Sequence, residues 1–292
     1  MKLSIITINY NNSEGLKRTL ESVVNQTNKE FEHIVVDGGS SDGSVSVIKS
    51  YEELIITNRV NRETQYPLIS WVSEKDKGIY NAMNKGVRKA QGEYVLMLNS
   101  GDYLVDEHVI ERMTLELDGT DIVQGNNIED RNGIVYRNRG YGKSDIDMND
   151  VLHGHFLHQS SFCRRDLFDK YGYFDESYRI VGDTKFFMNC LGLHNATFKY
   201  VDIDVANYDC NGVSAPQLGQ WNEPSKSEYN QLVSELFSQR MVTYVMGNEK
   251  KVRLYDRLHQ HKWIWNLTMM VAHINSWFYG KPKNGIIEEQ RV

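Results

Sequence analysis

The first hundred residues alternate between short apolar runs and segments whose apolar positions recur at helical spacing. The apolar runs lie at 3–8, 31–36, 68–72 and 94–98. The continuous, β-branched run at 3–8 predicts a strand buried on both faces of a sheet. Residues 31–36 are expected to form a second buried strand, and 68–72 and 94–98 two further strands. The helical segments are expected from Ser13 as N-cap, over 44–51, and from Gly78 onward. This repeat predicts an α/β fold with a mostly parallel sheet and right-handed crossovers.

Beyond residue 120 the alternation becomes less regular. Short strands are predicted at 121–124, 133–137 and 197–205, and helices at 165–170 and 183–191. After Pro216 the composition changes, with helical spacing over 228–245 and a Trp- and Met-rich stretch over 261–278. We therefore expect one α/β domain over 1–215, divided into halves 1–102 and 103–215, and a helical C-terminal extension over 216–292.

Charge and composition exclude several classes of function. The 292 residues carry a formal net charge of −6 and a pI near 5.9, which argues against broad binding to nucleic acid. No apolar stretch reaches the ~20 residues that would span a bilayer, and the N-terminus lacks the pattern of a signal peptide. Three widely spaced cysteines without a CxxC motif favour reduced thiols in a cytoplasmic protein.

Three predicted strands each end in an aspartate, namely Asp37, Asp76 and Asp102. Each has a structural explanation, as a turn residue, a helix cap or part of a tight turn. The carboxyl ends of parallel strands meet at one edge of a sheet, where ligands of such folds bind. Carboxylates there suit the hydroxyls of a nucleotide and a divalent cation shared with its phosphates. No GxGxxG or P-loop motif is present, so dinucleotide and P-loop phosphate binding are not supported.

Four ordered motifs resemble the family 2 glycosyltransferases of GT-A fold. They are SIITINYN at 4–11, VVDGGSSDG at 35–43, DKGIYNAMNKG at 76–86 and LNSGD at 98–102. The resemblance is closest to the bacterial branch that builds surface polysaccharides, colanic-acid-type enzymes included, and covers roughly residues 1–205. It implies a Rossmann-like GT-A domain over 1–215, with a nucleotide-sugar-binding half before an acceptor-binding half.

The same resemblance implies a nucleotide-diphospho-sugar donor, preferably a UDP-sugar, an inverting transfer, and Mn2+ or Mg2+ as cofactor. The implied donor-binding residues are Thr7, Asn9, Asp37, Asp76, Asn84, Lys85, Asn99, Ser100 and Gly101. Asn99 and Gly101 occupy positions that are usually acidic in the Asp-x-Asp signature of this family. Asp102 is then the one strong metal ligand left in the motif.

The second half offers one candidate general base, Asp183, at the start of a predicted helix. The family usually has Glu-Asp where this chain has Gly182-Asp183, and Asp183 also suits the role of helix N-cap. The resemblance favours His158 and Gln159 as contacts to acceptor or diphosphate, with His158 within reach of the metal. A zinc-like cluster of His153, His155 and His158 is less favoured, because their spacing divides the rings between two faces.

Two readings remain open for the Trp-rich stretch that includes Trp263, Trp265 and Trp277. These aromatics either pack C-terminal helices onto the catalytic domain or form an interfacial surface on a membrane that carries a lipid-linked acceptor. The expected partners are thus the nucleotide-sugar donor and a glycan or lipid-linked glycan, with no nucleic acid. The expected location is the cytoplasm, including the inner face of the cell membrane.

Two rival functions were weighed against a glycosyltransferase. A catalytically weak assembly protein that only binds nucleotide-sugars would fit the altered Asn99 and Gly101, but it has no need of Asp183. A nucleotidyltransferase would require a Gly-rich, basic loop after the first strand, which Asn9 and the residues after it do not provide. The sequence thus favours the transferase.

Overall fold

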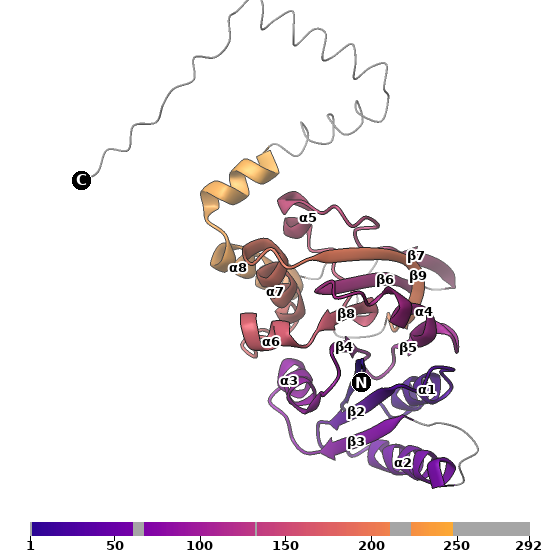
Figure 1. Ribbon diagram of the computed structural model, residues 1–292. Coiled ribbons are helices and arrows are strands. Elements are labelled where there is room, and N and C mark those ends of the chain that lie inside the picture. The colour runs from indigo at the N-terminus through magenta and orange to yellow at the C-terminus, as the bar shows by residue number, and fades with distance from the viewer. Residues whose placement is uncertain (1, 61–66, 132, 211–222, 248–292) are drawn as a thin grey trace, which may run out of the picture. The chain divides into compact units, whose positions relative to one another are not determined.

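The computed structural model describes residues 2–60, 67–131, 133–210 and 223–247. Those up to Ser238 fold around one mixed nine-stranded sheet (Figure 1). The strands are β1 (Leu3–Asn9), β2 (Phe31–Asp37), β3 (Leu68–Ser73), β4 (Tyr94–Met97), β5 (Tyr103–Leu104), β6 (Ile122–Arg131), β7 (Ile134–Asn138), β8 (Ser161–Arg164) and β9 (Phe198–Tyr208). Their order is β3-β2-β1-β4-β8-β6-β9-β5, and β7 pairs with β6.

The helices connect these strands and cover both faces of the first half of the sheet. They are α1 (Ser13–Val24), α2 (Ser44–Val60), α3 (Ile79–Lys89), α4 (Val109–Glu116), α5 (Met148–His153), η1 (His158–Ser160), α6 (Asp166–Tyr171), α7 (Gly182–Met188), η2 (Asn189–Leu193) and α8 (Glu223–Leu236). Figure 1 shows α1 and α2 on one side of β1–β3, and α3 on the other. The predicted α/β class is confirmed.

The parallel half follows directly from the apolar pattern. Strands β3, β2, β1 and β4 are mutually parallel, and every residue of β1 and β2 is buried. Helix α1 turns Leu16, Leu20 and Val23 inward, as its spacing predicts. The expected N-cap at Ser13 is wrong by one residue: Asn12 is the cap, because its side-chain oxygen accepts the N–H of Gly15.

The second half departs further from the prediction. Strand β8 runs antiparallel to both β4 and β6, and so inserts between the parallel half and the β6–β9 pair. Neither β8 nor helices α4 and α5 stand out in the sequence, because each is short. The helix predicted over 228–245 is also interrupted: α8 ends at Leu236, and helical residues resume at 239–247.

Residues Met1–Ser238 form one compact unit, and Gln239–Val292 form a second. Helix α8 lies in the first unit, although the sequence places it in the predicted C-terminal extension. The expected boundary near residue 215 and the Trp-rich stretch fall outside the described residues, so both remain predictions. Within the described ranges, no helix has the length and apolar character needed to cross a bilayer.

Candidate functional site

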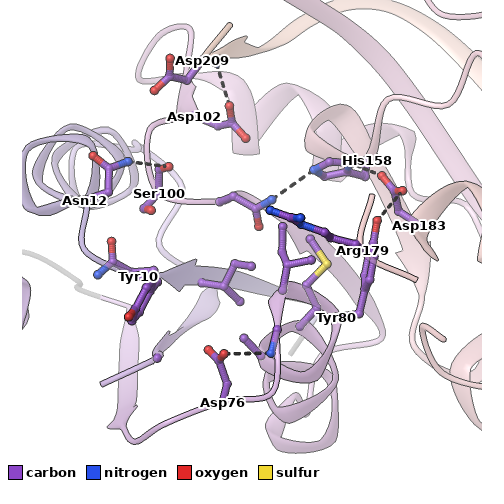
Figure 2. Close-up of a pocket in the computed structure, with 18 of the residues that line it drawn as sticks. Tyr10, Asn12, Asp76, Tyr80, Ser100, Asp102, His158, Arg179, Asp183 and Asp209 are labelled. Atoms are coloured by element: carbon purple, nitrogen blue, oxygen red, sulfur yellow. Dashed lines mark hydrogen bonds and ion pairs between the residues drawn. The ribbon is translucent and has the colours of Figure 1, made fainter. Parts of the chain in front are cut away.

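A cavity of about 780 Å3 opens at the carboxyl ends of β1, β2 and β4, where the sequence places its aspartates (Figure 2). The predicted site residues that line it are Asn9, Asp76, Asn99, Ser100, Asp102, His158, Gln159 and Asp183. The predicted residues outside its described lining are Thr7, Asp37, Asn84, Lys85 and Gly101. The structure thus brings the aspartates of both halves to one cavity, with the exception of Asp37.

The carboxylate of Asp37 is fully buried and is bound by its own loop and by the ends of β1 and β3. One oxygen accepts Asn9 Nδ2 at 2.8 Å and the Ser40 hydroxyl at 2.6 Å. The other accepts the Ser73 hydroxyl at 2.7 Å and the backbone N–H groups of Gly39 and Ser40. Burial alone would raise the pKa of Asp37, but these hydrogen bonds outweigh it and lower the pKa below its usual value. Asp37 therefore shapes the loop over 38–40.

Thr7 and Asn84 are also occupied inside the protein. The Thr7 hydroxyl lies 2.9 Å from His33 Nε2, within a fully buried pair. Asn84 fastens α3 to the segment before α7, because its amide bonds the backbone N–H and carbonyl of Phe174 and the carboxylate of Glu176.

Lys85, the remaining charged member of the α3 motif, forms an ion pair with Glu74 at 2.8 Å. The side chains of Asn84 and Lys85 thus lie outside the described lining of the cavity, whereas Ala82 and Met83 of the same motif belong to it.

Asp76 and Asn9 are the donor-motif side chains that reach the cavity from β3 and β1. One Asp76 oxygen accepts the N–H of Gly78 at 3.0 Å, and the other lies beside Gly38. A Cβ at position 38 would stand 2.5 Å from that oxygen, so glycine there makes room for the carboxylate. Asn9 lines the cavity wall, and its Oδ1 atom is buried and has no hydrogen-bond partner among the described residues.

A second carboxylate, which the sequence reading missed, stands next to Asp102. Asp209 follows β9, and its backbone N–H donates to Asp102 Oδ1 at 2.8 Å (Figure 2). Gly101 has a φ of +107°, and a Cβ there would lie 2.6 Å from Asp209 Oδ2. Asp209 therefore occupies the space beside the glycine that replaces the usual acid.

Asp102 is only 4% exposed, and this burial raises its pKa to about 7. The charge of Asp209 adds to the rise, while the Asp209 N–H and the charge of His158 act in the opposite direction. On the outer side, Arg18 Nη2 lies 3.7 Å from Asp209 Oδ2. The Asp102 and Asp209 side chains border the same cavity, and carboxylate oxygens are ligands that suit a divalent cation.

Asp183 is held at the far wall of the cavity by three groups (Figure 2). Its Oδ2 accepts His158 Nδ1 at 2.7 Å, and its Oδ1 accepts the Tyr80 hydroxyl at 3.1 Å and the N–H of Thr184 at 2.8 Å. Burial would raise the pKa of Asp183, but the hydrogen bond and charge of His158 prevail and lower it. Burial would likewise lower the pKa of His158, and its bond to Asp183 raises it instead.

The alternative role of Asp183 as an N-cap does not match the structure. The cap of α7 is Val181, and no side chain caps that end. Gly182 precedes Asp183 because a Cβ there would lie 2.7 Å from the ring of Tyr80. The absence of the usual glutamate at 182 therefore has a steric reason: the Tyr80 ring, which bonds Asp183, fills its place.

His158 links this wall to the Asp102 side. Its Nε2 lies 3.3 Å from Asn99 Nδ2, so Asn99, His158 and Asp183 form one chain of contacts. The Oδ1 atom of Asn99 is buried and lacks a hydrogen-bond partner within the described ranges. His153 and His155 stack on each other at 6.2 Å instead of joining His158. Nowhere in the described part of the chain do three or more His, Cys, Asp or Glu side chains form a metal-binding group.

Two cationic side chains, Lys75 and Arg179, also line the cavity. Arg179 is exposed and forms no ion pair with any residue that the structure describes. It lies four residues before Asp183, and both side chains belong to the same wall (Figure 2). An unpaired arginine in a cavity with several carboxylates provides a site for a phosphate group.

A second cavity of about 290 Å3 adjoins the first. Both cavities are lined by His158, Gln159, Ile180, Asp183 and Tyr208. The floor of the second is polar and comes from β6 and β7, with Asn127, Glu129, Arg131 and Asn138. Asp183 therefore stands where the two cavities meet.

Sequence reasoning missed Asp209, Tyr80 and Arg179. Asp209 follows the last predicted strand, so the rule that identified the other strand-end aspartates applies to it as well. Tyr80 lies inside the DKGIYNAMNKG motif, where its hydroxyl gave a usable signal. A lone arginine four residues from Asp183 carries no comparable signal.

Comparison with known protein families gives one match that covers more than half of the chain. The model described as glycosyl transferase family 2 matches residues 4–172. A PGL/p-HBAD biosynthesis glycosyltransferase of Mycobacterium tuberculosis is 29% identical over 217 residues, which cover 70% of this chain and 76% of the relative. An uncharacterized glycosyltransferase of the same organism is 30% identical over 227 residues, covering 76% and 79%.

Solved structures with the same fold include two that contain nucleotide-sugars. TarS 1–349 of S. aureus in complex with UDP-GlcNAc has a TM-score of 0.59 at 19% identity, covering 80% of this chain and 64% of that one. The mannosyltransferase PcManGT from Pyrobaculum calidifontis, in complex with GDP-Man and Mn2+, has a TM-score of 0.55 at 14% identity, covering 96% and 88%. At these identities the likeness establishes the fold, and the predicted GT-A class is confirmed.

Proposed function

This chain belongs to glycosyl transferase family 2, and we propose that it moves a sugar from a nucleotide-diphospho-sugar onto a glycan or lipid-linked glycan with inversion at the anomeric carbon. The observation that carries this proposal is the position of Asp183. It lines both a cavity with the size and polar groups for a nucleotide-sugar and an adjoining polar cavity for an acceptor. Transferase activity itself follows from the family and from the relatives named glycosyltransferases.

We assign the nucleoside to the walls formed by β1, β2 and α3. Asp76 and the unpartnered Asn9 Oδ1 are acceptors for a base N–H and for ribose hydroxyls. Asp37 acts in this proposal through its loop, because its oxygens already accept five hydrogen bonds from Asn9, Gly39, Ser40 and Ser73. A UDP-sugar is the favoured donor, since UDP and UDP-GlcNAc occur in the TarS structures.

The residues near Asp102 fit a divalent cation of the Mn2+ or Mg2+ type. Two carboxylates, those of Asp102 and Asp209, line the same cavity, and the buried Oδ1 of Asn99 has no hydrogen-bond partner among the described residues. Hard cations prefer such oxygen ligands and share the remaining positions with phosphate oxygens and water. When bound, the cation would neutralise charge on the departing diphosphate. Arg179 would bind the same diphosphate from the opposite wall.

The proposed reaction is a single displacement at the anomeric carbon. The acceptor hydroxyl oxygen forms a bond to this carbon while the bond to the diphosphate oxygen breaks, and the nucleoside diphosphate leaves. The acceptor proton moves to the Asp183 carboxylate, which its lowered pKa keeps ionised at neutral pH. A weak base is sufficient, because the hydroxyl becomes strongly acidic as its oxygen bonds to carbon.

We assign the acceptor to the second cavity. Its arginine, Arg131, is already paired with Glu129 within the described structure, and Glu129 also accepts Asn138 Nδ2 at 2.6 Å. Planar polar groups that bond one another in this way suit sugar hydroxyls better than an anionic group. The resemblance that the sequence motifs suggest to surface-polysaccharide enzymes of colanic-acid type supports a glycan acceptor in this proposal, and a lipid-linked form would require contact with the inner face of the membrane.

A panel of donors tests the proposal. UDP-, GDP- and dTDP-sugars are offered with Mn2+, Mg2+ or EDTA, and both binding by calorimetry and nucleoside diphosphate release are measured. We expect metal-dependent binding and release with one class of donor. In Asp102→Asn, added metal should increase donor binding and nucleoside diphosphate release less than it does in the wild type. Tight binding without release, even with a panel of neutral acceptor glycosides, would favour the nucleotide-sugar-binding assembly protein. Absence of binding to every donor would overturn the proposed function.

A further inference from the structure

Helix α8 contacts the active-site wall through one carboxylate, that of Glu228. Its Oε1 accepts the backbone N–H of Arg179 at 3.1 Å. Its Oε2 accepts the backbone N–H groups of Ile180 at 2.8 Å and Val181 at 3.2 Å. Three consecutive amides therefore point at one side chain that lies almost fifty residues further along the chain.

These three amides belong to the segment that carries the reacting groups. Arg179 lines the donor cavity, and Asp183 lies two residues after Val181. On the other side of the segment, the Ile180 carbonyl accepts the hydroxyl of Tyr80 at 2.5 Å, and the same hydroxyl bonds Asp183. The backbone at 179–181 is thus held between Glu228 and Tyr80, and its position determines where Asp183 and Arg179 lie.

Other contacts fix α8 to the protein independently of Glu228. Leu232 is fully buried, and the Tyr229 hydroxyl donates to the carbonyl of Leu152. Glu235 binds Lys185 of α7 at 2.8 Å, and Lys185 also binds Asp175 at 2.7 Å. Since these contacts remain when Glu228 is replaced, α8 is expected to stay in place while the segment over 179–181 loses its acceptor.

We propose that Glu228 is a positioning residue of the active site, which orients the segment over 179–183 toward the donor and acceptor. This inference rests on the function proposed above for Asp183. It extends the active site to α8, which lies beyond the matched residues 4–172 and inside the region that the sequence assigned to an extension. The role needs a carboxylate, because two oxygens without hydrogens accept three N–H groups, and charge-assisted bonds of this kind are stronger than neutral ones.

Three variants separate positioning from general stability. Glu228→Ala removes both oxygens, and Glu228→Gln keeps one oxygen but turns an NH2 group toward the backbone amides. The matched control is Glu235→Gln, which alters another carboxylate of α8 without touching 179–181. Each is compared with the wild type by amide hydrogen exchange of peptides over 178–183, by UDP affinity, and by kcat and KM for UDP release from UDP-GlcNAc or the donor that the panel identifies.

In Glu228→Ala, we expect exchange at 179–181 to accelerate by about tenfold or more. We also expect kcat to fall by about tenfold to a hundredfold, because small displacements of Asp183 are costly, and UDP affinity to fall by a smaller factor, because Arg179 moves with the same segment. Glu228→Gln should lie between the alanine variant and the wild type, and Glu235→Gln should resemble the wild type. Equal effects at 228 and 235, or unchanged exchange and kcat in the alanine variant, would overturn the inference. Failure of the wild type to bind any donor would instead refute the proposed function, while the exchange experiment would still test the contact.

Discussion

The two halves of the site use their polar residues in opposite ways. In the nucleotide half, the side chains of Thr7, Asp37 and Asn84 belong to clear motifs, yet they bond the neighbouring strand β2, the loop after β2 and the segment before α7, and stay out of the cavity. In the other half, Asp183, His158 and Asp209 reach the cavity from three separate elements. The named motif side chains of the first half thus hold the framework around the cavity, whereas those of the second half present their polar groups to it.

This difference shows that a motif can mark a framework as well as a contact. The loop after β2 requires its buried carboxylate to fold, so Asp37 is essential even if no ligand touches it. The reacting groups of the second half are instead held by partners that no local pattern reveals, such as Tyr80 on Asp183 and Glu228 on the adjacent backbone. Substitutions on the two sides should therefore fail in different ways, through stability in one half and through turnover in the other.

The strongest test of this contrast is Asp183→Asn. An amide cannot accept the proton of the acceptor hydroxyl, so we expect kcat to fall by about 10²–10⁴-fold, the range for loss of a general base. UDP affinity should remain close to that of the wild type, as measured by calorimetry. Asp175→Asn is the control, because Asp175 binds Lys185 in the same region but lies outside both described cavity linings. Substantial turnover by Asp183→Asn would assign the proton transfer to another group.

Asp37→Asn is expected to lower the stability of the fold. The change in the free energy of unfolding should be smaller than the change in activation free energy for Asp183→Asn. The new NH2 group would face the backbone N–H groups of Gly39 and Ser40 and leave them without an acceptor. Buried, unsatisfied groups of this kind cost ~1–3 kcal/mol each, so we expect the free energy of unfolding to fall by about 2–4 kcal/mol. Urea denaturation measures this change.

Asp42→Asn is the matched control for Asp37→Asn. Asp42 caps the same loop and also accepts backbone N–H groups, but its side chain is exposed to solvent. We expect Asp42→Asn to lower the free energy of unfolding clearly less than Asp37→Asn does. If Asp37→Asn kept its stability and lost only UDP affinity, Asp37 would be a direct ligand of the nucleotide, and the contrast between the halves would fail.

The smallest of the expected changes concerns Asp209→Asn. Removing one of two adjacent carboxylates should weaken Mn2+ binding roughly tenfold, because cation affinity depends on ligand charge. Electron paramagnetic resonance titration of free Mn2+ in the presence of UDP measures this directly, without turnover. Asp202→Asn serves as control, since Asp202 lies on the same strand β9 and pairs with Arg137. An unchanged Mn2+ affinity in Asp209→Asn would mean that Asp209 is not a ligand, and Asp102 would remain as the proposed carboxylate ligand.

The sequence predicts the fold best where local pattern and burial agree. Strands β1, β2 and β4 are continuous apolar runs because they are buried on both faces, and their helices have one apolar side. Strand β8 is only four residues long and follows the turn η1, so neither alternation nor length distinguishes it from a loop. Its antiparallel insertion beside β4 depends on tertiary pairing, which periodicity does not encode.

The candidate site was predictable to the same extent. Asp76, Asp102 and Asp183 were found because strand ends and the start of a helix are positions with a known geometric meaning. Asp209 was missed, although the same rule applies to it, because the metal was assigned to the motif at 98–102. Glu228 could not be found from the sequence, since its role depends on three amides that only the folded chain brings to it.

Gly101 and Gly182 limit the substitutions that this chain can accept one at a time. Each stands where related enzymes usually carry an acid, and each has a neighbour from a distant segment in the vacated space: Asp209 beside Gly101 and the Tyr80 ring beside Gly182. A single step back to the common residue would meet that neighbour before it regained any benefit. Introducing an acid at position 101 or 182 would therefore also require a change at Asp209 or Tyr80, respectively, and design on this scaffold would have to exchange both members of each pair together.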